Sequence, residues 1–173
     1  ADATEATERR PVHLSVVVDT SGSMAGAGKI DHAQMAATQL ARLLEPGDSF
    51  SLVSFSDDAS VVVPTGPATA STVARQVGAL TPEGGTNLYA GLERGLQQLT
   101  NTSLDGVKRV VLLSDGVATV GNTHPASLSR LAGSRVSEGI SVSALGLGLD
   151  YNEDLLASMS DLGGGTYRFV DAP

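Results

Sequence analysis

The chain has 173 residues, of which 41% are hydrophobic and 17% charged, with a net charge of −8 and no cysteine. This length and composition suit one globular α/β domain and exclude a disordered chain, and the missing cysteine excludes disulfides, thiolate metal sites and a cysteine nucleophile. Lys and Arg are not clustered, and no apolar run approaches the roughly 20 residues that span a bilayer. We therefore expect neither nucleic-acid binding nor membrane insertion by this domain.

The beginning of the chain predicts a flexible lead-in and then a central strand. Residues 1–10 are small, polar and charged without periodicity, and we place one domain over residues 11–173. The apolar run Leu14–Val18 indicates a strand that is buried on both faces, as at the centre of a parallel sheet. The carboxyl end of such a strand lies at the edge where open α/β sheets bind ligands.

Three oxygen-bearing side chains follow this strand: Asp19, Ser21 and Ser23. Because they alternate along a turning loop, the three side chains can converge on one point. A carboxylate and two hydroxyls suit a hard cation such as Mg²⁺. The same residues are also compatible with a simple turn in which the serines only cap the next helix.

The next segment predicts a helix, a pair of strands and a second helix. Apolar residues recur at helical spacing over residues 29–44, before a Pro-Gly-Asp turn. Phe50–Phe55 and Ala59–Val63 predict two strands, and their short connection makes them antiparallel. We place the second of these strands at the sheet edge, ended by Pro64. Residues 73–80 then indicate a short helix.

Two further polar clusters lie downstream. Residues 81–87 form a Pro- and Gly-rich loop in which the backbone can approach a ligand closely, and Thr86 lies just before a leucine-rich helix. Ser114-Asp115-Gly116 directly follows the buried strand Val110–Leu113. Taken alone, Thr86 could be only a helix N-cap, and Asp115 could be only part of an Asp-Gly turn.

The rest of the chain continues the alternation of strands and helices. Residues 122–125 open a helix that we extend to Val136, and Ile140–Leu147 predicts another strand. A short helix follows, capped by Asp150 or Asn152, and Thr166–Val170 predicts the last strand.

This order of elements predicts the fold and the position of the polar clusters. It implies a Rossmann-like, doubly wound, mostly parallel six-stranded sheet with one antiparallel edge strand and helices on both faces. The first and fourth strands should be neighbours, at the point where the winding reverses. Asp19 and Asp115 would then lie side by side at one edge of the sheet, with the loop of Thr86 next to them.

Taken together, the three clusters resemble a known site. Asp19-Thr20-Ser21-Gly22-Ser23, Thr86 and Ser114-Asp115-Gly116, in this order, resemble the metal-ion-dependent adhesion site (MIDAS) of von Willebrand factor type A (vWA) domains. The resemblance covers nearly the whole chain after the lead-in. It is greatest to bacterial extracytoplasmic members, and it extends less closely to inter-alpha-trypsin inhibitor heavy chains.

The resemblance implies a role for each residue. Ser21 and Ser23 would bind the ion directly, Thr86 directly or through water, and Asp19 and Asp115 mainly through water. The expected ion is Mg²⁺, with Mn²⁺ or Ca²⁺ as substitutes. A shell rich in neutral hydroxyls leaves the charge of the ion incompletely compensated, so the ion would accept an Asp or Glu carboxylate from a partner protein. The resemblance thus implies a non-catalytic adhesion module, and it alone favours an extracytoplasmic location.

Three other functions match parts of the sequence. Asp19-Thr20-Ser21 partly matches the nucleophile loop of magnesium-dependent haloacid-dehalogenase-type phosphatases, but Ser21 stands where these enzymes need a second acid. Residues 22–29 superficially suggest a Walker loop, but they hold one residue too many, and Ile30 replaces the required Ser or Thr. A structural module whose metal binds no partner stays open.

The three histidines do not indicate a catalytic site. We expect His13, His32 and His124 on the surface, because no serine nucleophile and acid complete a triad with them.

Overall fold

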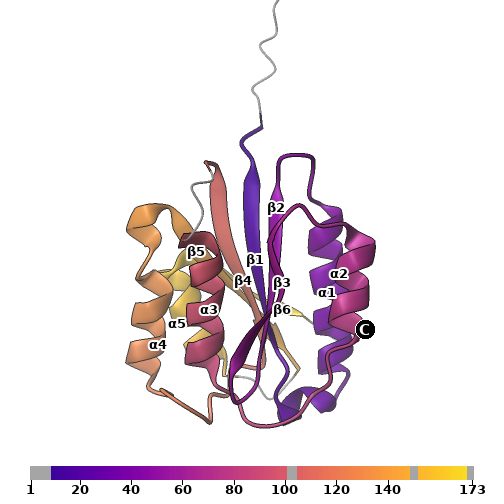
Figure 1. The fold of residues 1–173 in the computed structure, drawn as a ribbon. Coiled ribbons are helices and arrows are strands. Elements are labelled where there is room, and N and C mark those ends of the chain that lie inside the picture. The colour runs from indigo at the N-terminus through magenta and orange to yellow at the C-terminus, as the bar shows by residue number, and fades with distance from the viewer. Residues whose placement is uncertain (1–8, 101–104, 149–151, 171–173) are drawn as a thin grey trace, which may run out of the picture.

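A six-stranded sheet lies between two layers of helices (Figure 1). The computed structural model describes residues 9–100, 105–148 and 152–170, so most of the lead-in and Asp150 lie outside the described residues. The strands are β1 (Val12–Asp19), β2 (Ser49–Phe55), β3 (Ala59–Gly66), β4 (Val107–Ser114), β5 (Ile140–Leu147) and β6 (Gly164–Val170). The helices are α1 (Lys29–Arg42), α2 (Ala70–Gly78), α3 (Leu88–Thr100), α4 (Pro125–Gly133) and α5 (Glu153–Leu162), with 3₁₀ turns η1 (Gly22–Ala25) and η2 (Val136–Glu138).

The strand order confirms the predicted topology. The order across the sheet is β3-β2-β1-β4-β5-β6, and every neighbouring pair is parallel except β2 and β3. β1 and β4 are neighbours in register, with Val18 opposite Leu113. Their carboxyl ends therefore lie at the same edge of the sheet, which is the lower edge in Figure 1.

Two apolar cores hold the helical layers on the sheet. Side chains of β1 alternate between the faces, so Val17 packs with α3, α4 and α5, whereas Val16 and Val18 pack with α1 and α2. Leu14 and these three valines are at most 7% exposed, as expected for a strand that is covered on both sides. Within the described part of the chain, no helix is long and apolar enough to cross a membrane.

Helix α3 lies close to the sheet. A methyl group at Gly91 would overlap the ring of Phe55, and one at Gly95 would overlap a methyl of Val17. The two glycines are therefore required for the close approach of α3 to β2 and β1, where they leave space for side chains that the strands supply. This packing fixes the start of α3, next to the loop that carries Thr86.

Two predicted boundaries are wrong for identifiable reasons. β3 does not end at Pro64 but continues to Gly66, and the β2–β3 register shifts between Phe50 and Leu52. An edge strand tolerates a proline at such an irregularity, because few of its N–H groups are needed for pairing. Helix α4 ends at Gly133, so Val136 lies in the turn η2 and is 43% exposed instead of packing as a helical residue.

Helix α5 confirms one of the two predicted caps. The side chain of Asn152 accepts a hydrogen bond from the backbone N–H of Leu155. This interaction satisfies one of the free N–H groups of the first turn.

Candidate metal centre

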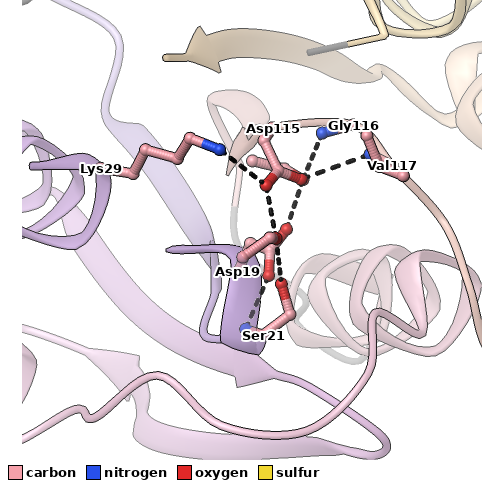
Figure 2. A network of polar contacts seen from close by, with 8 residues as sticks. Asp19, Ser21, Lys29, Asp115, Gly116 and Val117 are labelled. Atoms are coloured by element: carbon pink, nitrogen blue, oxygen red, sulfur yellow. Dashed lines mark hydrogen bonds and ion pairs between the residues drawn. The ribbon is translucent and has the colours of Figure 1, made fainter. Parts of the chain in front are cut away.

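Asp19 is held at the carboxyl end of β1 by its own loop and by β4. Its carboxylate is fully buried. One oxygen, Oδ1, accepts the backbone N–H of Ser21 at 2.8 Å, and the other, Oδ2, accepts the hydroxyl of Ser114 at 2.7 Å. The side chain therefore joins the ends of two neighbouring strands (Figure 2).

The two serines of this loop continue the network instead of capping a helix. The hydroxyls of Ser21 and Ser23 are 3.0 Å apart, and Ser23 donates to Oδ2 of Asp115 at 2.5 Å. Ser21 precedes η1 but makes no side-chain cap, and α1 begins only after Gly28. The interpretation that these serines act only as caps is therefore wrong.

Asp115 lies just beyond the end of β4 and is 1% exposed. Its Oδ1 accepts the backbone N–H of Val117 at 3.3 Å, and its Oδ2, which accepts the Ser23 hydroxyl, also pairs with Lys29 (Figure 2). Gly116 has a φ of +75°, and the Asp115 side chain, by accepting the N–H two residues further on, forms an Asx turn. The turn and the network coexist, because the turn uses one carboxylate oxygen and the network uses the other.

The loop of Thr86 is bonded to the loop of Asp19 through the backbone. The N–H of Glu83 donates to the carbonyl of Thr20, and the N–H of Gly22 donates to the carbonyl of Gly84, both at 2.9 Å. These two hydrogen bonds hold the glycine-rich loop beside the carboxyl end of β1.

Thr86 itself does not cap α3. Asn87 performs that role, since its Oδ1 accepts the N–H of Ala90 at 3.0 Å. Thr86 is 3% exposed, and its hydroxyl makes no hydrogen bond to any residue that the structure describes. A hydroxyl without a protein partner retains its capacity to bind a ligand.

Thr119 and Asp57 position this loop. The Thr119 hydroxyl accepts the N–H of Thr86, and Oδ1 of Asp57 accepts the N–H of Gly85, each at 2.9 Å. A methyl group at Gly85 would contact both of these side chains and overlap Val120. Asp57 lies in the connection between β2 and β3, so this contact joins that connection to the glycine-rich loop.

Four of the five predicted site residues thus share one hydrogen-bonded network, and Thr86 lies in the loop bonded to it. The network joins Asp19, Ser21, Ser23 and Asp115, with Ser114 as the link between the two strands. Ser114 was noted in the sequence only as a neighbour of Asp115. Its hydroxyl reaches Oδ2 of Asp19 at the end of the neighbouring strand β1, a contact that the sequence pattern alone does not show.

Lys29 is the residue that sequence reasoning missed. Its Nζ lies 3.4 Å from Oδ2 of Asp115, and its side chain is only 11% exposed. Lys29 is the first residue of α1, where the helix dipole disfavours a positive charge. A lysine at a helix start in an acidic chain indicates an acidic partner outside the helix. That partner is Asp115, 86 residues further along the chain.

Burial and charge act together on the two acids. Burial raises the pKa of Asp19, and the negative charge of Asp115 adds to this effect, while hydrogen bonds from Ser21 and Ser114 partly oppose it. A positive charge beside Asp19 and Asp115, at the carboxyl edge of the sheet, is therefore favourable. Within the described ranges, no group of three or more His, Cys, Asp or Glu side chains could hold a metal ion, so the oxygens gathered here come from two acids and several hydroxyls.

The histidines lie away from this network, although one is not on the surface. His13 is 2% exposed, and its ring nitrogens contact the Ser49 hydroxyl at 2.6 Å and the carbonyl of Asp105 at 2.9 Å. The expectation of an exposed His13 is wrong, because the amino ends of three strands enclose its ring. His124 is exposed, and its Nδ1 accepts the N–H of Ala126 at the start of α4.

A doubly wound sheet with acids and hydroxyls gathered at its carboxyl edge defines an α/β domain of the vWA type. The family description "von Willebrand factor type A domain" matches residues 14–117, which is more than half of the chain. The chain therefore belongs to the vWA family, whose domains are common adhesion and protein-interaction modules and are generally not enzymes.

Relatives from bacteria and mammals support this assignment. The uncharacterized protein YfbK of Escherichia coli is 29% identical over 92% of this chain, and inter-alpha-trypsin inhibitor heavy chain H4 of Homo sapiens is 32% identical over 97%. The chain spans only 28% and 19% of the lengths of these two proteins. Both groups named from the sequence, bacterial members and the heavy chains, are thus confirmed as relatives.

Solved structures share the fold. A von Willebrand factor type A structure from Catenulispora acidiphila superposes with a TM-score of 0.80 at 26% identity, covering 95% of this chain and 39% of that one. Proximal thread matrix protein 1 from the mussel byssus, described with zinc in its MIDAS motif, superposes with a TM-score of 0.75 at 19% identity, covering 93% of this chain and 42% of that one.

Proposed function

We propose that this edge of the sheet binds one divalent cation and, through it, an acidic group of a partner protein. The residues that would hold the ion are Asp19, Ser21, Ser23, Thr86 and Asp115. The ion would supply a strong positive charge that attracts a carboxylate of the partner. The chain would act as a non-catalytic adhesion-type module, as is common in its family.

The observation that carries this proposal is the joining of two buried acids by serine hydroxyls. Asp19 and Asp115 are 0% and 1% exposed, and they come from neighbouring strands whose ends meet at one edge. Two buried carboxylates repel each other and lose hydration, which a cation placed between their ligand oxygens would offset. Ser23 is exposed, so the network reaches the surface where a partner can bind.

The kinds of donor fit a hard divalent cation. Carboxylate and hydroxyl oxygens are the ligands that Mg²⁺, Mn²⁺ and Ca²⁺ prefer, and the network contains no thiolate or imidazole. We propose Mg²⁺ as the resident ion, with Mn²⁺ or Ca²⁺ as substitutes. The zinc described in the mussel protein's MIDAS motif makes zinc the competing ion to include in a titration.

Location and domain limits are part of the same proposal. A membrane protein from Bacteroides fragilis shares the fold at 21% identity, and this likeness agrees with an extracytoplasmic location for the present domain. We place the domain over residues 11–173. Arg9, inside the predicted lead-in, pairs with Asp48 at 2.9 Å, so at least the end of the lead-in contacts the domain.

Two threonines of neighbouring loops provide a matched test of metal binding. Thr86→Ala removes a hydroxyl that has no partner among the described residues, so it should weaken Mn²⁺ binding at least about tenfold and leave stability nearly unchanged. Thr20→Ala removes a hydroxyl that donates to the carbonyl of Phe55 at 3.0 Å, so it should lower stability by about 1 kcal/mol and leave Mn²⁺ affinity unchanged. Calorimetric titration and urea unfolding measure the two properties, and equal Mn²⁺ affinity in both variants would contradict the site.

Partner binding needs a separate experiment. Proteins captured by the wild-type chain in Mg²⁺ should be released by EDTA and should not bind Ser21→Ala. Capture that resists both changes would show that the metal has only a structural role. Hydrolysis of p-nitrophenyl phosphate in Mg²⁺ that disappears in Asp19→Asn would instead support a phosphatase and overturn the non-catalytic proposal.

A further inference from the structure

The fold leaves space for the Lys29 side chain to contact Asp115. Lys29 starts α1, and its ammonium group lies 3.4 Å from Oδ2 of Asp115 (Figure 2). A methyl group at Gly148, which has a φ of +77°, would overlap Cε of Lys29. The glycine therefore provides the space that the lysine stem occupies.

The positive charge of Lys29 is unfavourable at the start of α1 but stabilises the carboxylate of Asp115. A positive charge in the first turn of a helix opposes the helix dipole. The 11% exposed lysine side chain is compensated by the carboxylate of Asp115, which is 1% exposed and accepts the Ser23 hydroxyl on the same oxygen. The pair is thus desolvated on both sides, so its charge is only weakly screened by solvent.

The lysine changes the charge of the centre in the metal-loaded protein. Two carboxylates and one divalent cation would together be neutral, and the ammonium group leaves one positive charge in excess. A nearby positive charge repels a divalent cation and attracts an anion, and both effects are strong at the effective dielectric constant of a partly buried site.

On the basis of the proposed function, we propose that Lys29 lowers the affinity of the centre for its cation and raises the affinity of the loaded centre for an anionic group of the partner. Lys29 is then a specificity-determining residue for carboxylate partners. A neutral residue at this position would hold the ion more tightly but would attract a carboxylate less. A residue with a merely structural role would not shift the two affinities in opposite directions.

The chain offers a matched control, since it contains only two lysines. Lys29→Met keeps an aliphatic stem beside Gly148 and removes the charge. Lys108→Met makes the same change at the opposite end of β4, so both variants have the same net charge. Lys29→Arg retains the charge, and Lys29→Gln is a second neutral variant for use if the methionine variant is not folded by circular dichroism.

Two titrations of the 173-residue chain test the proposal. Mn²⁺ binding is measured by calorimetry, and acetate binding to the Mn²⁺-loaded protein is measured by the loss of water-proton relaxation as acetate displaces metal-bound water. For Lys29→Met we expect roughly tenfold tighter Mn²⁺ binding and at least about threefold weaker acetate binding. Lys108→Met and Lys29→Arg should both resemble the wild type.

The possible results separate this inference from the function it rests on. If the wild type binds Mn²⁺ but the neutral Lys29 variants match it in both titrations, the charge role is wrong and the metal site stands. If the neutral variants bind Mn²⁺ more weakly, Lys29 serves to position Asp115, and the inference is again overturned. If the wild type binds no Mn²⁺, the proposed function itself is wrong.

Discussion

Replacement by alanine should change the stability of the protein differently at Ser114 and at Ser51. Both serines lie in the sheet and are 0% exposed. Replacement by alanine removes one hydroxyl oxygen from each. The Ser114 hydroxyl donates to Asp19 at 2.7 Å and accepts the N–H of Gly116 at 2.9 Å. The Ser51 hydroxyl has no hydrogen-bond partner in the part of the chain that the structure describes. We therefore expect Ser114→Ala to destabilise the protein and Ser51→Ala not to.

The magnitude follows from the hydrogen bonds that each change removes. A hydrogen bond to a charged group contributes about 1.5–3 kcal/mol, and a buried N–H without an acceptor costs about 1–3 kcal/mol. Because Asp19 keeps its bond to the Ser21 N–H, we expect Ser114→Ala to lower the free energy of unfolding by about 2–4 kcal/mol. Removing the unpaired Ser51 hydroxyl should leave this free energy unchanged or raise it by up to about 1 kcal/mol.

Urea unfolding in EDTA, followed by circular dichroism, measures both values without any contribution from bound metal. A loss of about 2–4 kcal/mol corresponds to a fall in Tm of roughly 5–15 °C for a chain of this length, which calorimetry can check independently. If the two alanine variants unfold at the same urea concentration, the network at the strand ends does not stabilise the fold, and this reasoning is refuted.

Two further predictions concern the packing of α3 and the amino end of the sheet. Gly95→Val should cost at least about 2 kcal/mol in urea unfolding, because β1 has no space for the added side chain, whereas Gly78→Ala, with open space around it, should be neutral or stabilising. The hydrogen bond from Arg9 lowers the pKa of Asp48 to about 2, below its ordinary value of 3.8, so the carboxylate stabilises the fold above about pH 4 and loses this effect as the pH falls toward 2. Because Arg9 is half-exposed, we expect a contribution of about 1–2 kcal/mol, and Asp48→Asn should remove this part of the pH dependence of unfolding between pH 5 and 2.

The sequence predicted the strands and the site edge well, because both depend on local patterns. The valines before Asp19 can pack only in a strand covered on both faces, and the acid after them must then lie at the carboxyl edge. The same reasoning placed Asp115 beside Asp19, since the right-handed crossover rule leaves few strand orders.

Features that depend on tertiary packing were predicted less well. Pro64 lies inside β3 because a register shift in an edge strand removes the need for its N–H, and no local pattern reveals that shift. Lys29 was considered only as part of a nucleotide-binding loop that did not fit. Its unfavourable place at a helix start was a usable signal, but its partner could not be identified before the fold brought the two together.

The glycines of α3 have a consequence for how the centre can respond to an ion. Gly91 and Gly95 lie over Phe55 and Val17, so sliding the helix along the sheet by one turn would bring Asn87 or Leu99 into one of the two positions. The helix therefore packs on the sheet in one position, and Thr86 lies just before its fixed start. Any adjustment of Thr86 toward a bound ion must therefore occur in the glycine-rich segment before it, and it would have to strain the hydrogen bonds that Asp57 and Thr119 make to that segment.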